Sequence, residues 1–382
     1  MVEYLPKSSR QEVQLREYTM NRREFIASMG GAAAVAAAPG ASLGAEVPEF
    51  ARGAVELGPI LKDAQVVRNP AMKGKAASFF IDDAIWFLRD LARQRPKSLF
   101  DNDFMKGLRY AHDRFGLKLQ VNLFYRTDFF YGMDEFTLAE VPDAYKAEWQ
   151  ANKDWLKLGF HSLQEFPDYP WVNIDYADVK KLFRMIKGEI YRFAGEGVFT
   201  TALVPHWCPM SKDGCRALKD CGIKLMECSV GPRYRYDGVR TRLPYGHALR
   251  LENNRKPETA FYWRDSRDAS IMSSVCSYNH ISAAQEKATE HSFAMVRDAD
   301  TGMLFKHLFN DAPVLNLVDV PTLRSDTEKL LGKEYLVFSD HEQYFFKDYF
   351  AYQPDYMEKV AVMSEIMAKN GYRFVFVEDI VV

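Results

Sequence analysis

Carboxylate and imidazole side chains stand at the ends of several apolar runs in this chain. The run "SFFIDDAIWF" places Asp82 and Asp83 side by side, and "LGFHSLQE" places His161 four residues before Glu165. If the second stretch turns helically, its imidazole and carboxylate share one face. Nitrogen and oxygen donors in this combination suit a divalent metal ion, with zinc as the expected one.

Other apolar runs also end in polar or aromatic residues. Because chemistry in parallel α/β folds sits at the carboxyl ends of the strands, we expect these residues to gather at one face. Aromatic rings beside polar groups also suit stacking against a sugar. The candidates are Tyr125, Arg126, His206, Trp207, His341, Glu342, Glu378 and Asp379.

The adjacent pair Asp82 and Asp83 needs an explanation, because like charges repel and a buried strand end removes their hydration. We expect one of them to cap the following helix, since Asp is a favoured N-cap and "AIWFLRDLARQ" has a helical pattern. A metal ion accounts for the other. It would hold Asp83 ionised and leave Asp82 beside it as a base.

Elements that would position these residues alternate along the chain. Short apolar runs predict buried strands, and amphipathic stretches between them predict helices, which indicates an α/β fold with a parallel sheet of about seven or eight strands. Its most economical closure is a single barrel over residues 76–382. The predicted strands are 78–82, 117–125, 158–162, 199–207, "IKLMECSV", 313–320, 334–342 and "YRFVFVEDI", with late helices near 284–298 and 355–370.

Two segments are expected to lie outside the regular barrel. Between about 231 and 285 the rhythm breaks into irregular antiparallel strands, which predicts an insertion over one face. Residues 46–75 are expected to form a loose N-terminal segment.

The N-terminus resembles a twin-arginine export signal. Arg22 and Arg23 precede a weakly apolar stretch rich in Ala and Gly, and cleavage is expected after Ala45. Met20 directly precedes this signal, so residues 1–19 are interpreted as an over-extended start. The mature chain is therefore expected in the periplasm or outside the cell.

Composition excludes some partners. The 382 residues are 47% hydrophobic, enough for a large core, and carry a net charge of −2 with no basic run in the mature part. This gives no electrostatic basis for binding nucleic acid or an anionic membrane surface. The stretch after the arginine pair is too short and too rich in small residues to span a membrane. The five cysteines lack CxxC spacing and are expected to be buried free thiols.

"FIDD" on the first strand, "HSLQE" on the third and a His at a late strand end resemble motifs of the polysaccharide deacetylases, a group of carbohydrate esterases. That family carries T-F-D-D, H-[ST]-x-x-H and L-x-H motifs on a deformed (β/α) barrel. The resemblance implies Asp82 as general base, Asp83 and His161 as metal ligands, and His341 as general acid.

The chain departs from the family pattern at the third metal ligand. Glu165 stands where the family has a second histidine, so either Glu165 binds the metal or His206 takes that place. The resemblance also implies a carbohydrate substrate. The residues expected to bind it are Tyr125, Arg126, His206, Trp207 and Glu342.

Three functions fit this pattern. The first is a metal-dependent hydrolase that removes an N- or O-acetyl group from a glycan. A second possibility keeps the barrel but cleaves a glycosidic bond with two carboxylates about 5–9.5 Å apart. The third is a glycan-binding barrel without catalysis. The candidate carboxylate pairs join either Asp82 or Asp83 to either Glu342 or Glu378.

Overall fold

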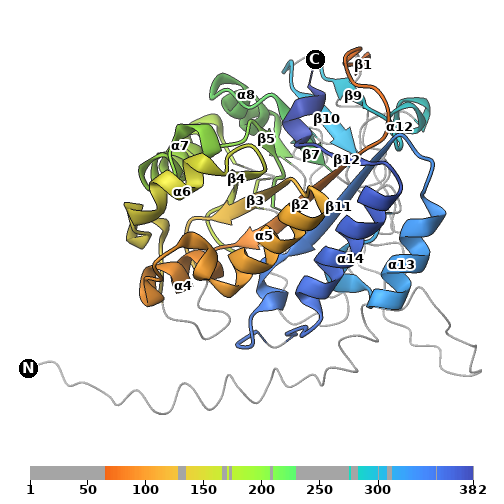
Figure 1. Cartoon of the computed structure of the whole chain (residues 1–382). Helices are drawn as coiled ribbons and strands as arrows, with labels where there is room; N and C mark the ends of the chain where they lie inside the picture. Colours follow the sequence, from red (N-terminus) through yellow and green to blue (C-terminus); the bar gives the residue numbers. More distant parts are fainter. Residues whose placement is uncertain are drawn as a thin grey trace, which may run out of the picture. The chain divides into compact units, whose positions relative to one another are not determined.

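The computed structural model describes residues 65–127, 135–165, 170–171, 174–206, 210–228, 275–276, 283–299, 301–307, 312–349 and 351–381. These residues form an α/β fold in which helices cover mostly parallel strands (Figure 1). The predicted export signal at 1–45 lies outside the described residues. So does most of the insertion expected at 231–285, whose described part is the short strand β8 (Val275–Cys276), antiparallel to β6 (Met210–Ser211).

One sheet has the strand order β11–β2–β3–β4, and all of these neighbours are parallel. Almost every residue in these strands is buried, which is why they read as continuous apolar runs in the sequence. All four strands lie where the sequence predicts them. They are β2 (Ala76–Ala84), β3 (Leu119–Phe124), β4 (Leu156–Ser162) and β11 (Tyr335–His341). A two-residue strand, β12 (Arg373–Phe374), pairs with the start of β2.

A second sheet has the order β1–β9–β10–β7–β5, in which β7 is parallel to both its neighbours and β9 is antiparallel to both of its own. A parallel bridge between Leu158 and Phe199 links β4 to the residues before β5. The strands are β1 (Gln65–Arg68), β5 (Ala202–Leu203), β7 (Leu225–Cys228), β9 (Ala294–Arg297) and β10 (Leu304–His307).

Two predicted elements are wrong. The helix expected near 284–298 ends early, since α12 (Ala283–Thr289) gives way to strand β9. Short apolar runs do not separate a buried strand from a buried helix, and here sheet pairing decides. The strand expected at 313–320 is instead a 3-10 turn at Leu315–Leu317, after which Asp319 caps α13 (Val320–Lys329).

Helices α5 and α14 pack side by side over strands β2 and β11 (Figure 1). α5 begins where the Asn102 side chain accepts the backbone N–H of Met105, and it ends at Gly116, whose φ is +72°. The other long helices are α4 (Trp86–Gln94), α7 (Tyr176–Phe193), α8 (Lys212–Asp220) and α14 (Tyr356–Lys369), with a short α6 (Lys146–Ala151).

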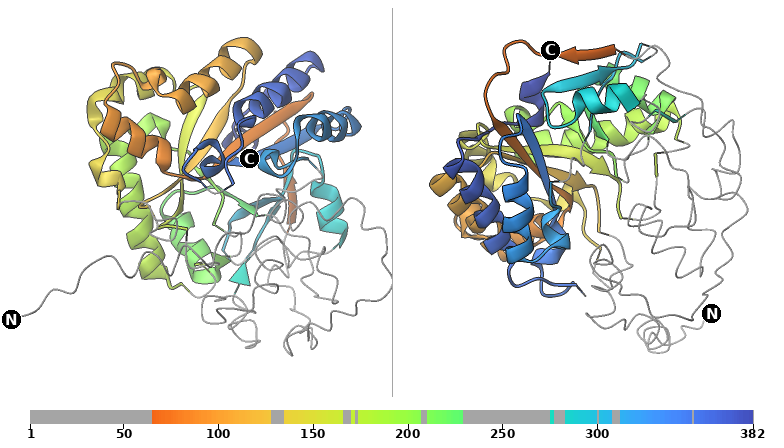
Figure 2. Two further views of the ribbon diagram at one scale, coloured as in Figure 1. Left: turned by 90° about the horizontal axis from the view of Figure 1, so that it is seen from below. Right: turned by 90° about the vertical axis from the view of Figure 1, so that its right-hand side faces the viewer.

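Both sheets contribute side chains to one apolar core. Phe80 and Tyr335 from the first sheet lie in the same buried cluster as Leu225, Met295 and Leu304 from the second. Figure 2 shows the two sheets from two further directions. The α/β fold with parallel strands is thus confirmed, and closure into a barrel stays a prediction.

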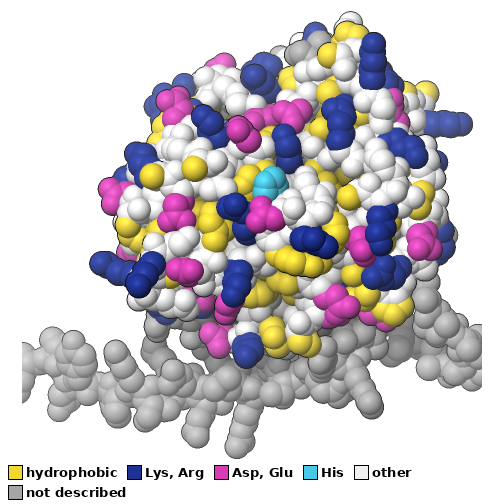
Figure 3. All heavy atoms as spheres, viewed as in Figure 1, with side chains coloured by type: hydrophobic (Ala, Val, Ile, Leu, Met, Phe, Trp, Pro, Cys, Tyr) yellow, Lys and Arg dark blue, Asp and Glu magenta, His cyan; other side chains and the backbone are white. Residues whose placement is uncertain are grey.

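The surface carries mixed charge. On the face shown in Figure 3, Lys and Arg side chains are interspersed with Asp and Glu, as expected for a net charge of −2. No helix in the described part of the chain is both long and apolar enough to cross a bilayer. Of the cysteines, Cys215 and Cys221 are free thiols.

Candidate metal centre

Strand β2 bulges where the two aspartates lie. Its pairing with β3 passes from Ile81 opposite Val121 to Ala84 opposite Leu123, so β2 holds one extra residue. Asp83 sits at the bulge with φ +58°, in the left-handed region that Asp tolerates better than most residues. Neighbouring side chains of a regular strand point to opposite faces. The bulge instead brings both carboxylates close to one imidazole.

That imidazole belongs to His161. Its Nε2 lies 3.0 Å from Asp83 Oδ1, and its Nδ1 lies 3.9 Å from Asp82 Oδ1. All three side chains are buried, with Asp82 7%, Asp83 6% and His161 2% exposed. The predicted proximity of the motifs on the first and third predicted strands is therefore present in the structure.

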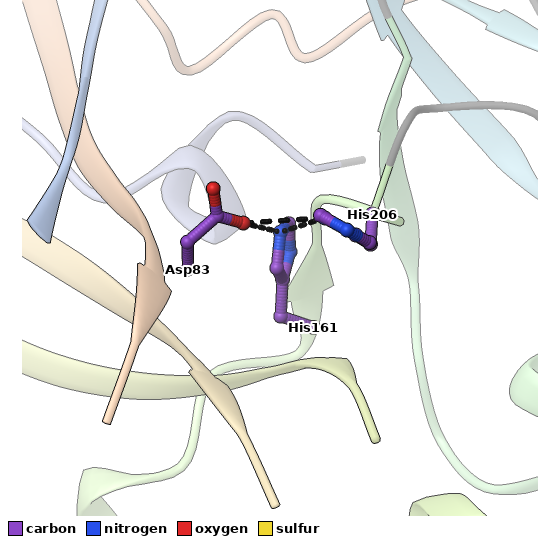
Figure 4. Close-up of side chains that lie close together, drawn as sticks. All are labelled: Asp83, His161 and His206. Atoms are coloured by element: carbon purple, nitrogen blue, oxygen red, sulfur yellow. Dashed lines mark hydrogen bonds and ion pairs between the residues drawn. The ribbon is translucent and has the colours of Figure 1, made fainter. Parts of the chain in front are cut away.

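His206 completes a cluster with Asp83 and His161 (Figure 4). His206 Nδ1 lies 3.2 Å from Asp83 Oδ1 and 3.1 Å from His161 Nε2. Among the described residues, these form the group of three whose ligand atoms all lie within 4.8 Å of one another. They come from the end of β2, the end of β4 and the segment just after β5.

Backbone carbonyls determine which ring nitrogens carry protons. His161 Nδ1 donates to the Val204 carbonyl oxygen at 2.7 Å, and His206 Nε2 donates to the Glu165 carbonyl oxygen at 2.8 Å. Since a carbonyl oxygen only accepts, each neutral ring keeps its proton there and turns its other nitrogen's lone pair toward Asp83. Metal-ligating histidines characteristically donate their second N–H in this way. The donor set of one carboxylate and two neutral imidazoles therefore fits a divalent cation such as zinc.

The pKa shifts favour the metal-binding forms of these side chains. Burial alone would raise the pKa of Asp83, but the adjacent His206 and His161 outweigh it and hold that pKa well below its usual range. Burial lowers the pKa of His161, although the adjacent carboxylate of Asp83 works in the opposite direction. An ionised carboxylate and a neutral imidazole are the species that coordinate a metal.

Asp82 is set apart from the cluster by its own hydrogen bonds. Its Oδ1 accepts from Asn122 Nδ2 at 2.6 Å, and Asn122 Oδ1 accepts from Gln120 Nε2 at 2.9 Å. Burial, and then the charge of Asp83, raise the pKa of Asp82 well above its ordinary value. Asn122 has room for this contact because Gly159 lies opposite on β4. A Cβ atom there would stand 2.5 Å from Asn122 Oδ1.

His341 lies at the end of β11, directly opposite Asp82 in the parallel register. Its Nδ1 lies 2.9 Å from Asn316 Oδ1, so a proton on Nδ1 leaves Nε2 as the nitrogen that exchanges protons. Burial lowers the pKa of His341, and the charge of Asp83 opposes this shift.

Glu342 does not have the role expected of it. Its Oε2 accepts the backbone N–H groups of Ile85 and Trp86 at 2.7 and 2.8 Å, and its Oε1 accepts that of Phe87 at 2.6 Å. The side chain is fully buried at the start of α4, which has no cap of its own. Both the expected Asp cap on this helix and the expected substrate contact of Glu342 are thereby corrected. Burial raises the pKa of Glu342 to about 8, against these three hydrogen bonds, which lower it.

Of the two alternatives for the third ligand, His206 lies in the cluster with Asp83 and His161, and the Glu165 carboxylate does not. Glu165 contributes its backbone carbonyl to His206 instead. Arg126 is half-buried and donates to Gln164 Oε1 at 2.5 Å, next to the half-buried Tyr125. Trp207 lies outside the described residues.

The structure does not bring together the carboxylates that were expected to form a pair for glycosidic cleavage. Glu378 accepts the Thr201 backbone N–H at 2.6 Å and lies 3.5 Å from Lys157 Nζ. These contacts are at the starts of β4 and β5, whereas Asp82 and Asp83 are at the end of β2. Glu342, as described, is bonded to the start of α4.

A small pocket opens beside Asp83, with about 250 Å³ of empty space including its mouth. The sequence interpretation missed most of its lining, although Phe124 and Gln343 each adjoin a predicted site residue. The Phe124 ring packs against both imidazoles, with centroid distances of 5.4 Å to His161 and 5.0 Å to His206. The lining residues are Asp83, Ile85, Trp86, Phe124, Thr127, Glu165 and Gln343.

The sequence interpretation also missed a buried ion-pair candidate behind the site. Glu227 of β7 and Lys306 of β10 are paired in register and fully buried. Burial raises the pKa of Glu227 to about 8 and lowers that of Lys306 to about 7. Lys306 Nζ donates to three backbone carbonyl oxygens, whereas neither Glu227 oxygen has a hydrogen-bond partner among the described residues.

No family model and no curated protein matches the chain. Among solved structures, it is similar to the 4-alpha-glucanotransferase from Thermococcus litoralis, with 11% identity and a TM-score of 0.44 over 81% of this chain and 40% of that one. It is also similar to a CE4 family pseudoenzyme from Bacillus anthracis, with 9% identity and a TM-score of 0.33 over 82% of this chain and 66% of that one. The chain spans less than two thirds of either protein. At these scores neither likeness carries an argument about function.

Proposed function

We propose that the protein is a metal-dependent hydrolase that removes an acetyl group from a glycan or a related carbohydrate. The observation that carries the proposal is the convergence of Asp83 Oδ1, His161 Nε2 and His206 Nδ1, with both rings held by carbonyl oxygens. A divalent cation held by these residues supplies Lewis acidity at the site. The motif resemblance to polysaccharide deacetylases supports the acetyl group and the carbohydrate as substrate.

Asp82 and His341 supply proton transfer in this proposal. Asp82 takes a proton from the attacking water, which suits a buried carboxylate whose pKa is raised and whose position Asn122 holds. His341 gives a proton to the leaving amine or hydroxyl, with its ring oriented by Asn316. The acyl carbon gains the water's oxygen, its bond to the sugar nitrogen or oxygen breaks, and acetate is released.

The pocket has an apolar lining beside the candidate metal ligands. Ile85, Trp86 and Phe124 give it apolar walls next to Asp83. Apolar walls exclude bulk water from the reacting group and strengthen electrostatic interactions within the site.

Metal content is the first test. We expect one divalent ion per chain in purified wild type, loss of that ion in Asp83→Ala, His161→Ala and His206→Ala, and retention in Glu165→Gln. His112→Ala serves as the control, since His112 stacks on Trp155 at a 4.3 Å centroid distance outside the cluster. An ion absent from reconstituted wild type would overturn the proposal.

Acetate release from acetylated oligosaccharides is the second test. Asp82→Asn keeps the cluster intact and removes the base, so it should retain the ion and lose roughly 10²- to 10⁴-fold in kcat. If metal-loaded wild type releases no acetate from N- or O-acetylated sugars, the proposed hydrolysis is wrong, although the proposed metal site is not.

Export by the twin-arginine route remains a proposal for residues 1–45. In a bacterial host, the full chain should appear in the periplasmic fraction, and replacement of Arg22 and Arg23 by Lys should retain it in the cytoplasm. Equal distribution of the two proteins would contradict it.

A further inference from the structure

Gln343 has a buried amide of which one end is unused. Its Nε2 donates to Asp83 Oδ2 at 3.1 Å, while its Oε1 is buried and has no hydrogen-bond partner among the residues that the structure describes. The residue is 5% exposed and lines the pocket beside Asp83. Buried polar atoms are nearly always paired in folded proteins, so an orphaned acceptor in a pocket wall indicates a donor on the molecule that binds there.

The orientation of this amide is determined by its partner. Reversing the Gln343 side chain would place Oε1 against Asp83 Oδ2, so two acceptors would face each other. The carboxylate therefore keeps the amide nitrogen on its own side and turns the carbonyl oxygen away from it. Oε1 belongs to the same amide as Nε2, so the unpaired oxygen lies next to the nitrogen that binds Asp83.

The segment that carries Gln343 is firmly attached to the opposite wall of the pocket. It belongs to the 3-10 turn Glu342–Phe345, whose first residue accepts the backbone N–H groups at the start of α4. Ile85 and Trp86, which donate two of them, line the same pocket. Glu342 thus connects the segment that carries Gln343 to the segment that carries Ile85 and Trp86, and this rigid connection keeps the pocket lining in a fixed geometry.

We infer that Gln343 Oε1 accepts a hydrogen bond from the amide N–H of the group being hydrolysed, and so selects N-acylated over O-acylated sugars. This inference rests on the proposed function. An amide carries its N–H next to the acyl carbon, whereas an ester has an oxygen there that only accepts. The ester would leave Oε1 unpaired and add a second acceptor facing it. In the reaction, water adds its oxygen to the acyl carbon, the C–N bond breaks, and the nitrogen leaves as a protonated amine.

The test compares two probes that differ by one N–H, methyl 2-acetamido-2-deoxy-β-glucoside and methyl 2-O-acetyl-β-glucoside. Because esters are intrinsically more reactive, the quantity to follow is how the ratio of kcat/KM values changes between wild type and Gln343→Met. We expect the substitution to lower kcat/KM for the amide by about ten- to a hundred-fold more than for the ester. Disturbed positioning of Asp83 alone would lower both equally.

Gln150→Met is the matched control, since Gln150 Nε2 donates to the Ala194 carbonyl at 2.6 Å, away from the pocket; it should leave the ratio unchanged. Equal losses for both probes in Gln343→Met would overturn the inference and leave the hydrolase intact. That result would also follow if a sugar hydroxyl were the donor. If neither probe releases acetate, the proposed hydrolysis fails, and the inference about Gln343 is tested by the affinities of the two probes from NMR titration. Tighter binding of the amide probe by wild type, lost in Gln343→Met, supports the inference. Equal affinities of wild type for the two probes overturn it.

Discussion

The carboxylate of Glu342 accepts the backbone N–H of Phe87 at 2.6 Å, joining residues that are 255 positions apart in the chain. Glu342 follows the late histidine His341, and Phe87 follows the aspartate pair after the first strand. The contact therefore brings the two distant segments that supply the proposed base and acid into one rigid unit. The helix dipole and the N–H groups at the start of α4 favour the charged form of Glu342, against its burial, which raises its pKa to about 8.

Removal of this cap should destabilise the fold. Glu342→Gln leaves one acceptor oxygen for three N–H groups and turns an amide NH₂ toward the others, so we expect a loss of about 2–4 kcal/mol in the free energy of unfolding. Urea unfolding measures it. Asp319→Ala is the control, because Asp319 caps α13 from an exposed position at 2.9 Å to Thr322 N and should cost only about 1 kcal/mol. Equal losses in the two variants would contradict the buried role of Glu342.

The left-handed conformation of Asp83 gives a prediction about backbone strain. Asp83→Gly and Asp83→Ala both remove the carboxylate, but only Ala is strained by the left-handed conformation at φ +58°. The Gly variant should therefore be more stable by about 1 kcal/mol. The same two substitutions at Asp90, inside α4, should reverse the order, since Gly is less favourable than Ala by about 1 kcal/mol in a helix. Thermal unfolding of the four variants measures these differences. If Ala were more stable than Gly at position 83, as it is expected to be at position 90, the left-handed conformation of Asp83 would be refuted.

Metal binding should be visible in stability. With zinc at about 100 times its Kd, wild type should gain about 2.7 kcal/mol, or about 4 °C in Tm, because the ion binds only the folded cluster. His206→Ala should show no such gain, and a chelator should reverse the gain in wild type. The measurement is differential scanning calorimetry with and without the ion. A similar gain in His206→Ala would place the bound zinc elsewhere in the chain.

Glu227 makes stability depend on pH. Its pKa rises from 4.5 unfolded to about 8 folded, so the native state keeps a proton that the unfolded chain releases. Its stabilising contribution is therefore complete below about pH 4.5 and is lost as pH rises through 8. The charges that act on it come from Lys306 beside it and from Asp82 toward the site.

Glu227→Gln cannot titrate, so its advantage in Tm over wild type should be near zero at pH 4.5 and reach several degrees at pH 8.5. Lys306 has the opposite trend, since its pKa of about 7 lies below its ordinary value and its contribution grows with pH above 7. Because the Glu227 charge raises the pKa of Lys306, the substitution also shifts the contribution of Lys306, and the comparison measures the pair. A Tm difference that stays constant from pH 4.5 to 8.5 would show that folding does not raise the pKa of Glu227.

The absence of a side chain at Gly159 should be necessary for the contact between Asn122 and Asp82. Ala at this position places a Cβ against Asn122 Oδ1, displaces the Asn122 amide from Asp82, and should lower acetate release by roughly tenfold or more while the ion stays bound. Gly188→Ala is the control, because no described residue places an atom within 4 Å of a Cβ there. Metal content and kcat are measured together. Loss of the ion in Gly159→Ala would indicate that the whole strand had moved, not Asn122 alone.

The sequence predicted the strands whose residues are buried on both faces and the polar ends of those strands. Asp82, Asp83 and His161 could be found because they directly follow long apolar runs. His206 was recognised as a site residue, but its place beside Asp83 depends on how β5 lies against β4, which local pattern does not encode. The Glu342 cap could not be predicted either, because its three partners are backbone groups and lie more than 250 residues away. Local helix signals pointed to the nearest Asp instead.

The carbonyl oxygens of Val204 and Glu165 hold the two imidazoles, and any residue has such an oxygen. Related chains can therefore differ freely in identity at Val204 and keep the same ring orientation, provided the number of residues between it and His206 is preserved. Insertion or deletion of a single residue there would turn the carbonyl away and dismantle the cluster without changing any ligand. Distant homologues of this chain should accordingly be sought by the spacing around the histidines rather than by residue identity.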